Sequence, residues 1–508
     1  MNRDVAAEPW VASEPGSGGA VAAPAMGAVA RGVSWKMLSV ILGQGAWYAS
    51  LLVLAILVPP GGFGVMAVGA AVVSFTLLIL ESGTGGSLII ASDLAPASVW
   101  RSLVRTSIAG VLATVLFAAL ASPIADVFTG GVDAGVLRVI AITVALAAVS
   151  IVPTALLSKH LRFKVSAQIV IASAAIASVA AIVAAALGAG VWALAIRIAL
   201  NQLLLTTLTW VAARDLLPPR EPSKGPIPRR PGATAFLLVA GAGFVAWTCD
   251  NLAVGAFTNP FQLGLYALAF SLAYAPLTQV SWTVGQVLLP TIAAAGDAEV
   301  VRRQTLKAIR IMALILLPLA PVAIALAPGL IPALGHKWDG MVVPFQILIV
   351  VGVGQGVTNT LGEALAGAGA RSVALRARID VPWALATIAA IVVGVNVGGI
   401  RGAAVAHVVT FSGLAVAFAW LGGRGIGLST RALLGAVRNV ATCVAIQAAV
   451  TAAVTLALDH GGSGALVAGM VGASIGVAAL VAALRLLAPD LLAEGRGVVR
   501  ATLRARRA

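Results

Sequence analysis

The chain has 508 residues, of which 60% are hydrophobic and only 10% are charged. Soluble proteins carry about 25% charged residues, so the composition excludes a soluble globular protein and predicts a polytopic membrane protein. The 33 basic and 18 acidic residues leave a net charge of +15. In a membrane chain this excess bears on which side of the bilayer the loops lie, rather than on nucleic-acid binding. Cys249 and Cys443 both lie in apolar segments, which argues against a disulfide framework or a cysteine-based metal site.

Fourteen segments are long and apolar enough to span a bilayer, which takes about 20 residues. They are preceded by residues 1–32, an Ala/Gly/Pro/Ser-rich stretch that we expect to be a disordered cytoplasmic tail rather than a signal peptide. Residues 82–100 form a broken stretch that leaves room for a short interfacial helix. The expected spans are 33–58, 63–82, 103–122, 136–158, 165–187, 190–213, 234–257, 263–289, 309–333, 341–366, 379–397, 400–420, 436–458 and 463–487.

The basic residues are distributed asymmetrically over the loops that these spans create. With both termini placed in the cytoplasm, 29 of the 33 Lys and Arg residues fall on the cytoplasmic side. Only Arg138, Lys337 and Arg401 face outward, and Arg197 lies within a span. This is the asymmetry that the positive-inside rule requires, and a miscounted span would invert every later loop. We therefore predict fourteen spans in the inner membrane with both termini in the cytoplasm.

The connections between spans divide the chain into six parts. We expect six spans in an N-terminal lobe (N-lobe, 33–213), a Pro/Arg-rich cytoplasmic linker (214–233) and six spans in a C-terminal lobe (C-lobe, 234–420). Two further spans (421–487) and a basic cytoplasmic tail (488–508) follow. Every outward loop is short, so the chain has no room for an extracytoplasmic enzyme domain, and we expect no enzymatic activity.

The two lobes show weak internal similarity in a constant order. Phe63-Gly64 resembles Leu263-Gly264, and Ala193-Leu194-Ala195 resembles Ala404-Val405-Ala406. The offset between matched positions rises slowly from 200 to 211, as accumulating loop insertions would produce. Because each lobe has an even number of spans, the copies share one orientation and form a parallel repeat about the membrane normal. Such repeats are typical of transporters, with the substrate site between the halves.

Several stretches of the chain resemble the polysaccharide-exporter (Wzx/WzxC-like) flippases of the multidrug/oligosaccharidyl-lipid/polysaccharide superfamily. The resemblance covers roughly residues 33–420, and the order of the stretches carries it. They are Pro153–Phe163, Gly190–Leu194, Asp250-Asn251, Leu263–Ala269, Val287–Pro290 followed by Asp297 and Arg302-Arg303, and Trp338.

This resemblance implies two six-helix lobes arranged in a V, and alternating access. The implied cargo is a polyprenyl-diphosphate-linked oligosaccharide or polysaccharide precursor, which would move from the inner to the outer leaflet. It also suggests that the last two spans extend a groove for the lipid. Two alternatives stay open: a cation-coupled antiporter for drugs or small solutes in the same superfamily, and a membrane scaffold for glycan synthesis that transports nothing.

Ionisable residues within spans are candidate site residues, because a charge at bilayer depth costs at least about 2.5–3.5 kcal/mol. Arg197 and Asp250 lie at about the same depth below the outer surface, judged from a rise of about 1.5 Å per residue. Arg197 could bind a diphosphate through two parallel hydrogen bonds. It could instead pair with Asp250 and join the lobes as an outer gate. Asp250 alone could bind a coupling proton or sodium ion.

Uncharged polar residues within spans are candidates for hydrogen bonds to sugars, although bonding between helices explains each of them equally well. With Arg197 and Asp250, we predict substrate contacts at Gln44, Asn201, Asn251, Gln279 and Gln286. Charged residues at the cytoplasmic ends of spans are gate or entry candidates. Glu81, Glu363 and Asp380 would form an inner gate, or are solvated or paired with Arg101, Arg376 or Arg378. Lys159 and Arg162 would lie where a lipid diphosphate enters, or are ordinary topology determinants.

Other motifs are absent from the sequence. It has no Gly-x-x-x-x-Gly-Lys-Ser/Thr motif for ATP binding, and its four histidines lack the spacing of a zinc site. We therefore expect no metal and no cofactor beyond a coupling ion. The expected partners are the lipid-linked oligosaccharide, the bilayer, and glycosyltransferases or a polymerase of the same pathway, but not nucleic acid.

Overall fold

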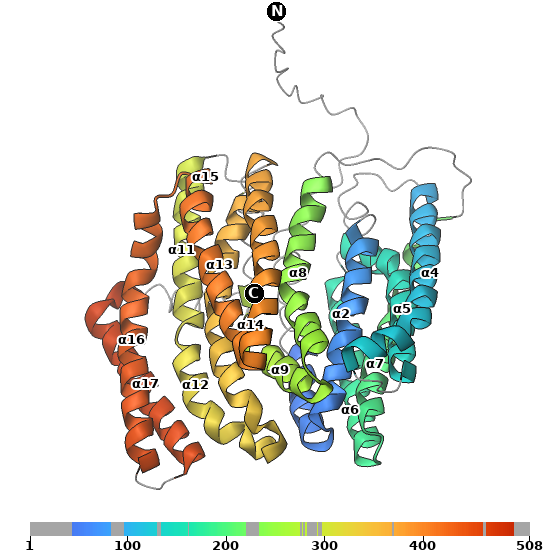
Figure 1. Cartoon of the computed structure of the whole chain (residues 1–508). Coiled ribbons are helices and arrows are strands. Elements are labelled where there is room, and N and C mark those ends of the chain that lie inside the picture. The colour runs from blue at the N-terminus through green and yellow to red at the C-terminus, as the bar shows by residue number, and fades with distance from the viewer. Residues whose placement is uncertain are drawn as a thin grey trace, which may run out of the picture.

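The computed structural model of the chain is a bundle of long helices (Figure 1). No strand occurs in the part of the chain that the structure describes, which confirms the all-α prediction. The predicted N-terminal tail, most of the predicted C-terminal tail and most of the predicted linker lie outside that part. The described residues are 43–82, 96–129, 134–160, 162–219, 233–274, 277, 280–281, 292, 297–367, 370–460 and 464–491.

The helices of the first half lie together on one side of the bundle in Figure 1. The first is a short apolar helix, Gly43–Leu57, here called the first helix. The helices that follow it are α2 (Pro60–Ser82), α4 (Pro96–Thr129), α5 (Ala134–Lys159), α6 (Phe163–Ala186), α7 (Val191–Ala213) and the 3-10 turn η1 (Arg214–Leu216).

The helices of the second half lie beside them, with the last two helices at the far edge (Figure 1). The C-lobe begins with α8 (Ala233–Phe257), α9 (Pro260–Ala273), α11 (Ala298–Leu316) and α12 (Leu319–Leu330). The remaining elements are η2 (Pro332–Leu334), η3 (His336–Met341), α13 (Val342–Gly367), α14 (Ala370–Ala417), η4 (Phe418–Gly422), α15 (Gly423–Gly425), α16 (Thr430–His460) and α17 (Ala465–Leu487).

Ten helices in the described residues are long and apolar enough to cross a membrane, and two shorter apolar helices accompany them. The single long helix α14 covers two of the predicted spans. It breaks at Gly398 and Gly399, and Gly399 has a φ of 56°, which glycine adopts without strain. Gly394 and Gly402 contact each other across the break, so the two arms fold back as a hairpin. The fourteen-span count itself stays a prediction.

Predicted and observed helix ends differ at both ends of α4. This helix runs over Pro96–Thr129, well beyond the predicted span 103–122, and continues through Pro123. Part of the stretch expected to hold an interfacial helix therefore belongs to α4, and residues 83–95 lie outside the described part. The apolar run alone marks the membrane-buried core of such a helix but not its polar ends.

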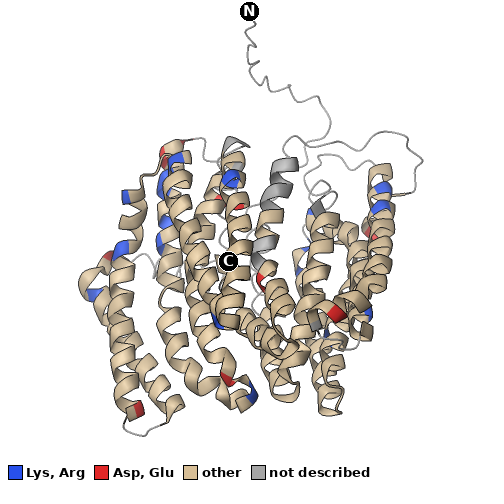
Figure 2. Cartoon of the chain, viewed as in Figure 1, with Lys and Arg blue, Asp and Glu red and all other residues tan. Residues whose placement is uncertain are grey.

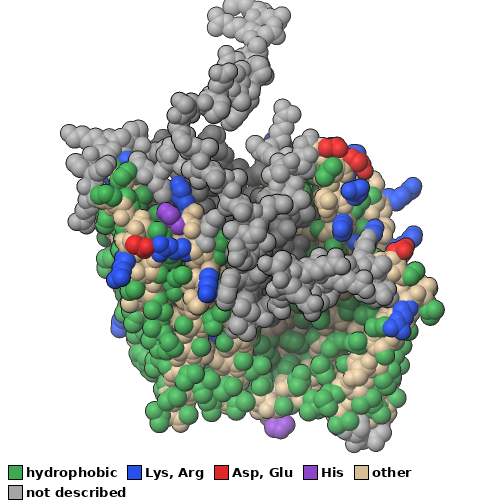
Figure 3. Space-filling view, turned by 180° about the vertical axis from the view of Figure 1, so that it is seen from behind, with side chains coloured by type: hydrophobic (Ala, Val, Ile, Leu, Met, Phe, Trp, Pro, Cys, Tyr) green, Lys and Arg blue, Asp and Glu red, His purple; other side chains and the backbone are tan. Residues whose placement is uncertain are grey.

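The outer surface of the bundle is apolar, as a lipid-facing surface requires. Leu112 and Leu116 on α4 are 65% and 61% exposed, and Val179 on α6 is 62% exposed. Hydrophobic side chains cover much of the face in Figure 3, with charged side chains concentrated toward one end. Large exposed apolar surfaces are unstable in water but stable in hydrocarbon. The chain is therefore a multi-pass membrane protein.

The two ends of the bundle differ in charge. The proline end is where α2 and α9 begin, at Pro60 and Pro260; the basic end is opposite, where α4 and α11 begin. Lys and Arg residues gather toward the basic end in Figure 2. The positive-inside rule predicts that the proline end lies outside the cell and the basic end in the cytoplasm.

Helices α16 and α17 pack on the C-lobe rather than between the lobes. Gly469 of α17 approaches the backbone at Ala325 of α12, and Gly329 of α12 approaches Leu466 of α17. Each close approach is possible because glycine has no side chain. The last two helices therefore extend the C-lobe sideways.

Candidate functional site

The two halves contact each other at the proline end through the first turns of α2 and α9. Gly64 and Gly264 each lie four residues after the proline that begins their helix. A Cβ atom on Gly64 would overlap the carbonyl oxygen of Pro260, and one on Gly264 would overlap that of Pro60. This contact, here called the glycine seam, brings backbone against backbone. The internal repeat pairs these same two glycines, and the structure places them in equivalent positions on either side of one contact.

The start of α9 is fixed by local sequence. The Asn259 side chain caps the helix by accepting a hydrogen bond of 2.8 Å from the backbone N–H of Gln262. Pro260 follows at the first helical position, where its missing N–H is not needed. The Asn-Pro pair therefore sets where α9 begins, and with it the position of Gly264 in the seam.

A second contact between the halves lies beside the seam and involves η3. The indole Nε1 of Trp338 donates a hydrogen bond of 2.8 Å to the carbonyl oxygen of Ala55. The Lys337 ammonium donates one of 2.8 Å to the carbonyl oxygen of Ile56. These carbonyls end the first helix, where intrahelical donors are lacking and the helix dipole favours a cation. The Lys337–Trp338 pair, here called the latch, thus caps an N-lobe helix from the C-lobe.

The latch is also packed. Trp338 is fully buried, and its ring meets that of Phe63 edge-on at 5.2 Å between centroids. Aromatic pairs of this kind contribute about 0.5–1.5 kcal/mol beyond the area they bury. Seam and latch together make the proline end a tight junction between the lobes.

A cluster of buried polar side chains lies inside the C-lobe, here called the Asp250 cluster. Asp250 on α8 and His407 on α14 are both fully buried, with 3.8 Å between the His407 Nδ1 and a carboxylate oxygen of Asp250. The Tyr266 hydroxyl of α9 donates a hydrogen bond of 3.1 Å to the same oxygen. The other oxygen accepts from the backbone N–H of Asn251 at 2.7 Å. Three helices therefore meet on one carboxylate.

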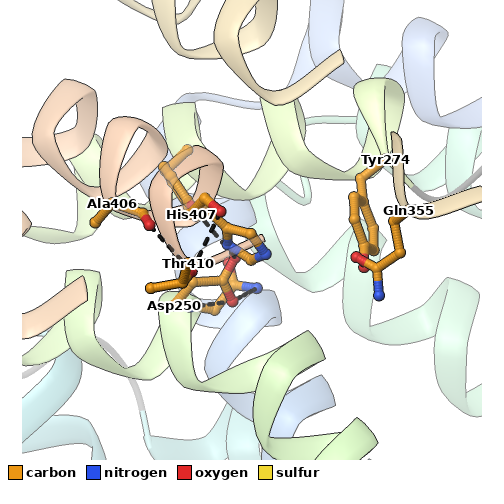
Figure 4. A network of polar contacts seen from close by, with 8 residues as sticks. Asp250, Tyr274, Gln355, Ala406, His407 and Thr410 are labelled. Carbon is orange, nitrogen blue, oxygen red and sulfur yellow. Dashed lines mark hydrogen bonds and ion pairs between the residues drawn. The ribbon is translucent and has the colours of Figure 1, made fainter. Parts of the chain in front are cut away.

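Aromatic rings extend this cluster along α9. Phe270 stacks on Tyr274 at 4.6 Å between centroids, and the His407 ring lies 6.0 Å from each of them. The Tyr274 hydroxyl donates a hydrogen bond to the Gln355 side chain on α13. Figure 4 shows Asp250 and His407 side by side, with Tyr274 and Gln355 forming a separate pair. The interior of the C-lobe thus carries polar groups on four helices.

The N-lobe holds an isolated buried cation. Arg197 on α7 is 2% exposed, and its guanidinium lies over the ring of Trp47 on the first helix, 3.5 Å from the centroid. Its terminal nitrogen donates a hydrogen bond to the Trp47 carbonyl oxygen, while its Nε has no partner. No acidic side chain of the described residues forms an ion pair with it. Stacking on the indole stabilises this charge without neutralising it.

The structure does not form the pair between Arg197 and Asp250 that equal depth suggested. Both residues lie about 10 Å from the proline end, at a rise of about 1.5 Å per residue. Arg197 contacts Trp47 of its own lobe, and Asp250 contacts Tyr266 and His407 of the other. Counting residues along a helix predicts how deep a residue lies in the membrane, but not the direction in which its side chain points.

The predicted sugar-binding residues have separate locations. Gln44 on the first helix and Asn201 on α7 are half-buried in the N-lobe. Asn251 belongs to the Asp250 cluster, where its side-chain amide donates a hydrogen bond of 3.3 Å to that carboxylate. Gln279 and Gln286 lie outside the described residues. Their role in binding sugars stays a prediction.

The gate and access candidates lie at the basic end. Arg376 bridges Glu363 at 3.2 Å and Asp380 at 3.3 Å, so the prediction that these carboxylates are paired with a neighbouring arginine is confirmed. The side chain of Glu81, at the end of α2, lies outside the described part.

The basic cluster that follows α5 contains Lys159 and Arg162. Arg162 forms a bidentate ion pair with Asp215, with the closer nitrogen–oxygen distance 2.5 Å. Both side chains are partly exposed, so the pair contributes at most about 1 kcal/mol. Lys159 is half-buried at the end of α5.

Sequence reasoning missed two features of the site. The spacing of the histidines argues only against a zinc site and gives His407 no role, although a histidine within an apolar span, at the depth of Asp250, is a signal for a polar partner. Lys337 was counted only as an outward-loop charge, and nothing local in the sequence indicates that it caps the first helix. No group of three metal-ligating side chains occurs among the residues that the structure describes.

Comparison with known proteins identifies the class. The profile of the family described as "Polysaccharide biosynthesis protein" matches residues 53–343, more than half of the chain. The chain is 25% identical over 351 residues to the succinoglycan biosynthesis transport protein ExoT of Rhizobium meliloti (strain 1021), covering 65% of this chain and 70% of that one. The chain belongs to the polysaccharide biosynthesis protein family.

Solved structures with the same fold are flippases and multidrug transporters. The lipid II flippase MurJ in an inward closed conformation matches with a TM-score of 0.61 at 10% identity, over 92% of this chain and 99% of that one. An inward-facing multidrug transporter of the MATE family matches with a TM-score of 0.50 at 17% identity, over 79% and 94%. At these identities the likeness shows the fold, which is that of the superfamily predicted from the sequence.

Proposed function

We propose that the chain is a flippase or exporter that moves a polyprenyl-diphosphate-linked oligosaccharide or polysaccharide precursor across the cytoplasmic membrane. Within this family and fold, the observation that carries the proposal is Arg197. A buried guanidinium without an acidic partner is expensive at bilayer depth, so it favours an anionic ligand. A diphosphate offers oxygens for two parallel charge-assisted hydrogen bonds, while the apolar prenyl chain remains in lipid.

The place where the lobes are joined supports alternating access. With the proline end facing outward, as the positive-inside rule predicts, the seam and the latch form the outer gate. Trp47, which covers Arg197, belongs to the helix whose end the latch caps. Movement of the first helix would therefore release the latch and uncover the guanidinium together, which couples diphosphate binding to gate opening.

The same proposal places both termini in the cytoplasm and the chain in the inner membrane. Its substrate would be supplied there by the glycosyltransferases that assemble the saccharide on its lipid. A polymerase acting on the outer side would use the product. The reaction that the chain itself performs is a transfer between leaflets, in which no covalent bond changes.

A reconstituted flipping assay tests the proposal. Vesicles containing the purified protein are loaded with a fluorescent polyprenyl-diphosphate oligosaccharide, and dithionite bleaches the label on the outer leaflet. We expect complete bleaching with the protein and about half without it. Arg197→Ala should slow flipping at least about tenfold, equivalent to about 1.4 kcal/mol. The matched control is Arg138→Ala, because Arg138 is also near the proline end but donates to Ser122 at the surface. Equal bleaching with and without the protein would refute the proposal.

The alternative function is a cation-coupled antiporter for small solutes, and the buried carboxylate of Asp250 favours it. The same vesicles distinguish the two functions. Accumulation of a cationic dye against its gradient, driven by an imposed proton or sodium gradient and accompanied by no flipping, would support the antiporter. A protein that does neither would be a scaffold for glycan synthesis.

A further inference from the structure

Among the residues that the structure describes, the Asp250 cluster has no permanent cation of the kind that a buried carboxylate ordinarily requires. Its titratable and polar neighbours are Cys249 and Asn251 on α8, Tyr266 on α9, Tyr274 at the end of α9 and His407 on α14. In the described part of the chain, no Lys or Arg side chain forms an ion pair with Asp250. With both groups deprotonated, the Asp250–His407 pair would hold one uncompensated negative charge in a fully buried site.

One proton removes this charge. Whether it lies on the carboxylate or on the imidazole, the pair becomes neutral overall. Both ring nitrogens of His407 are buried and without a hydrogen-bond partner among the described residues, so Nδ1 is available to carry the proton beside the Asp250 oxygen, which lies 3.8 Å away. The described residues contain no third acidic or histidine ligand that would favour a metal ion here.

The cluster is directly linked to the glycine seam through α9. Tyr266, which donates to Asp250, lies two residues after Gly264, and both lie in the 14-residue helix that begins at Pro260. The position of α9 therefore depends on the hydrogen bonds and charge of the cluster at one face and on the contact with α2 at the other. A change in the charge of the cluster therefore affects the position of α9, whose first turn forms the seam at the proline end.

We propose that Asp250 and His407 form a proton-binding site, and that release of its proton opens the glycine seam. The neutral, protonated pair is stable when buried and so favours the closed seam. The deprotonated pair leaves a buried charge that is stabilised only when water reaches it from the proline end, so it favours the open state. Coupling to transport rests on the proposed function, but proton binding and seam opening do not.

The test measures the distance between one spin label on each lobe, in protein to which no substrate has been added. Spin labels are placed at Leu187→Cys and Val397→Cys, which are 82% and 84% exposed and lie near the proline end of each lobe. Cys249 and Cys443 are replaced by alanine, and the protein is studied in lipid nanodiscs. Double electron–electron resonance is recorded from about pH 5 to about pH 8, the range over which histidine ordinarily titrates.

We expect the population with the longer distance to grow as pH rises. Asp250→Asn should hold the short distance at every pH, because its amide stays neutral, and His407→Gln should shift the midpoint. The matched control Asp459→Asn removes an exposed carboxyl group on α16 and should keep the response of the parent. A distance that does not change with pH would overturn the proposal, as would one that changes when sodium replaces choline at constant pH. If the parent protein does not flip the lipid-linked saccharide but its label distance still changes with pH, only the proposed function is refuted.

Discussion

The interiors of the two lobes differ at equivalent places of the repeat. In the N-lobe the first helix meets α7 through Trp47 and Arg197, and in the C-lobe α8 meets α14 through Asp250 and His407. In the described part of the chain the first contact holds a cation without an anion, and the second holds an acid beside a base. The glycine seam, in contrast, is alike on both sides. A two-fold junction between lobes requires matched surfaces, whereas the interiors are free to diverge into a site for an anion and a site for a proton.

The largest expected effect comes from breaking the matched junction. Gly264→Ala places a methyl group on the Pro60 carbonyl oxygen, and Gly64→Ala does the same at Pro260. Backbone cannot move aside as a side chain can, so each change should destabilise the closed seam by about 3 kcal/mol, the upper end of the usual cost of overpacking. The label distance between Leu187→Cys and Val397→Cys should lengthen at low pH in both variants.

The control for the seam is a glycine with free space around it. Gly241→Ala on α8 adds a methyl group where no described atom beyond its own stretch of helix lies within 4 Å, so the distance should stay that of the parent. A short distance in Gly264→Ala would show that the lobes are held together elsewhere.

A smaller effect is expected on thermal stability, which should differ between a variant in the interior of the C-lobe and one in the interior of the N-lobe. Asp250→Ala leaves the Tyr266 hydroxyl without its acceptor, at a cost of about 1–3 kcal/mol. Arg197→Ala removes an unpaired buried charge together with its stacking, so these two changes largely offset. Thermal unfolding of the purified protein should therefore begin at a lower temperature for Asp250→Ala than for Arg197→Ala. The reverse order would mean that Arg197 has an anionic partner in the resting protein.

The smallest effect should come from the latch. Trp338→Phe retains an aromatic ring against Phe63 but loses the hydrogen bond to the Ala55 carbonyl, worth about 1 kcal/mol. The midpoint pH for seam opening should fall, because less free energy then holds the lobes closed. A midpoint pH equal to that of the parent would show that the latch does not help to hold the lobes closed.

The sequence predicted the helical membrane fold because composition and the positions of basic residues follow directly from the bilayer. It also paired Gly64 with Gly264, since both follow a turn and open an apolar helix. It could not indicate which way Arg197 and Asp250 face, because a helix that is apolar on all sides carries no periodic signal of its orientation. His407 and Asp250 are far apart along the chain, so only the packing of α8 against α14 brings them together.

The most direct test of alternating access is to lock the seam. A Cβ atom on Gly61 would lie 3.9 Å from that of Pro260, within the range of about 3.5–4.5 Å found in disulfides. The double variant Gly61→Cys/Pro260→Cys, with the native cysteines replaced by alanine, is oxidised in flipping vesicles, and each single variant is the control. We predict that cross-linked protein does not flip the lipid-linked saccharide and that reductant restores flipping. Flipping at the full rate by fully cross-linked protein would contradict the account.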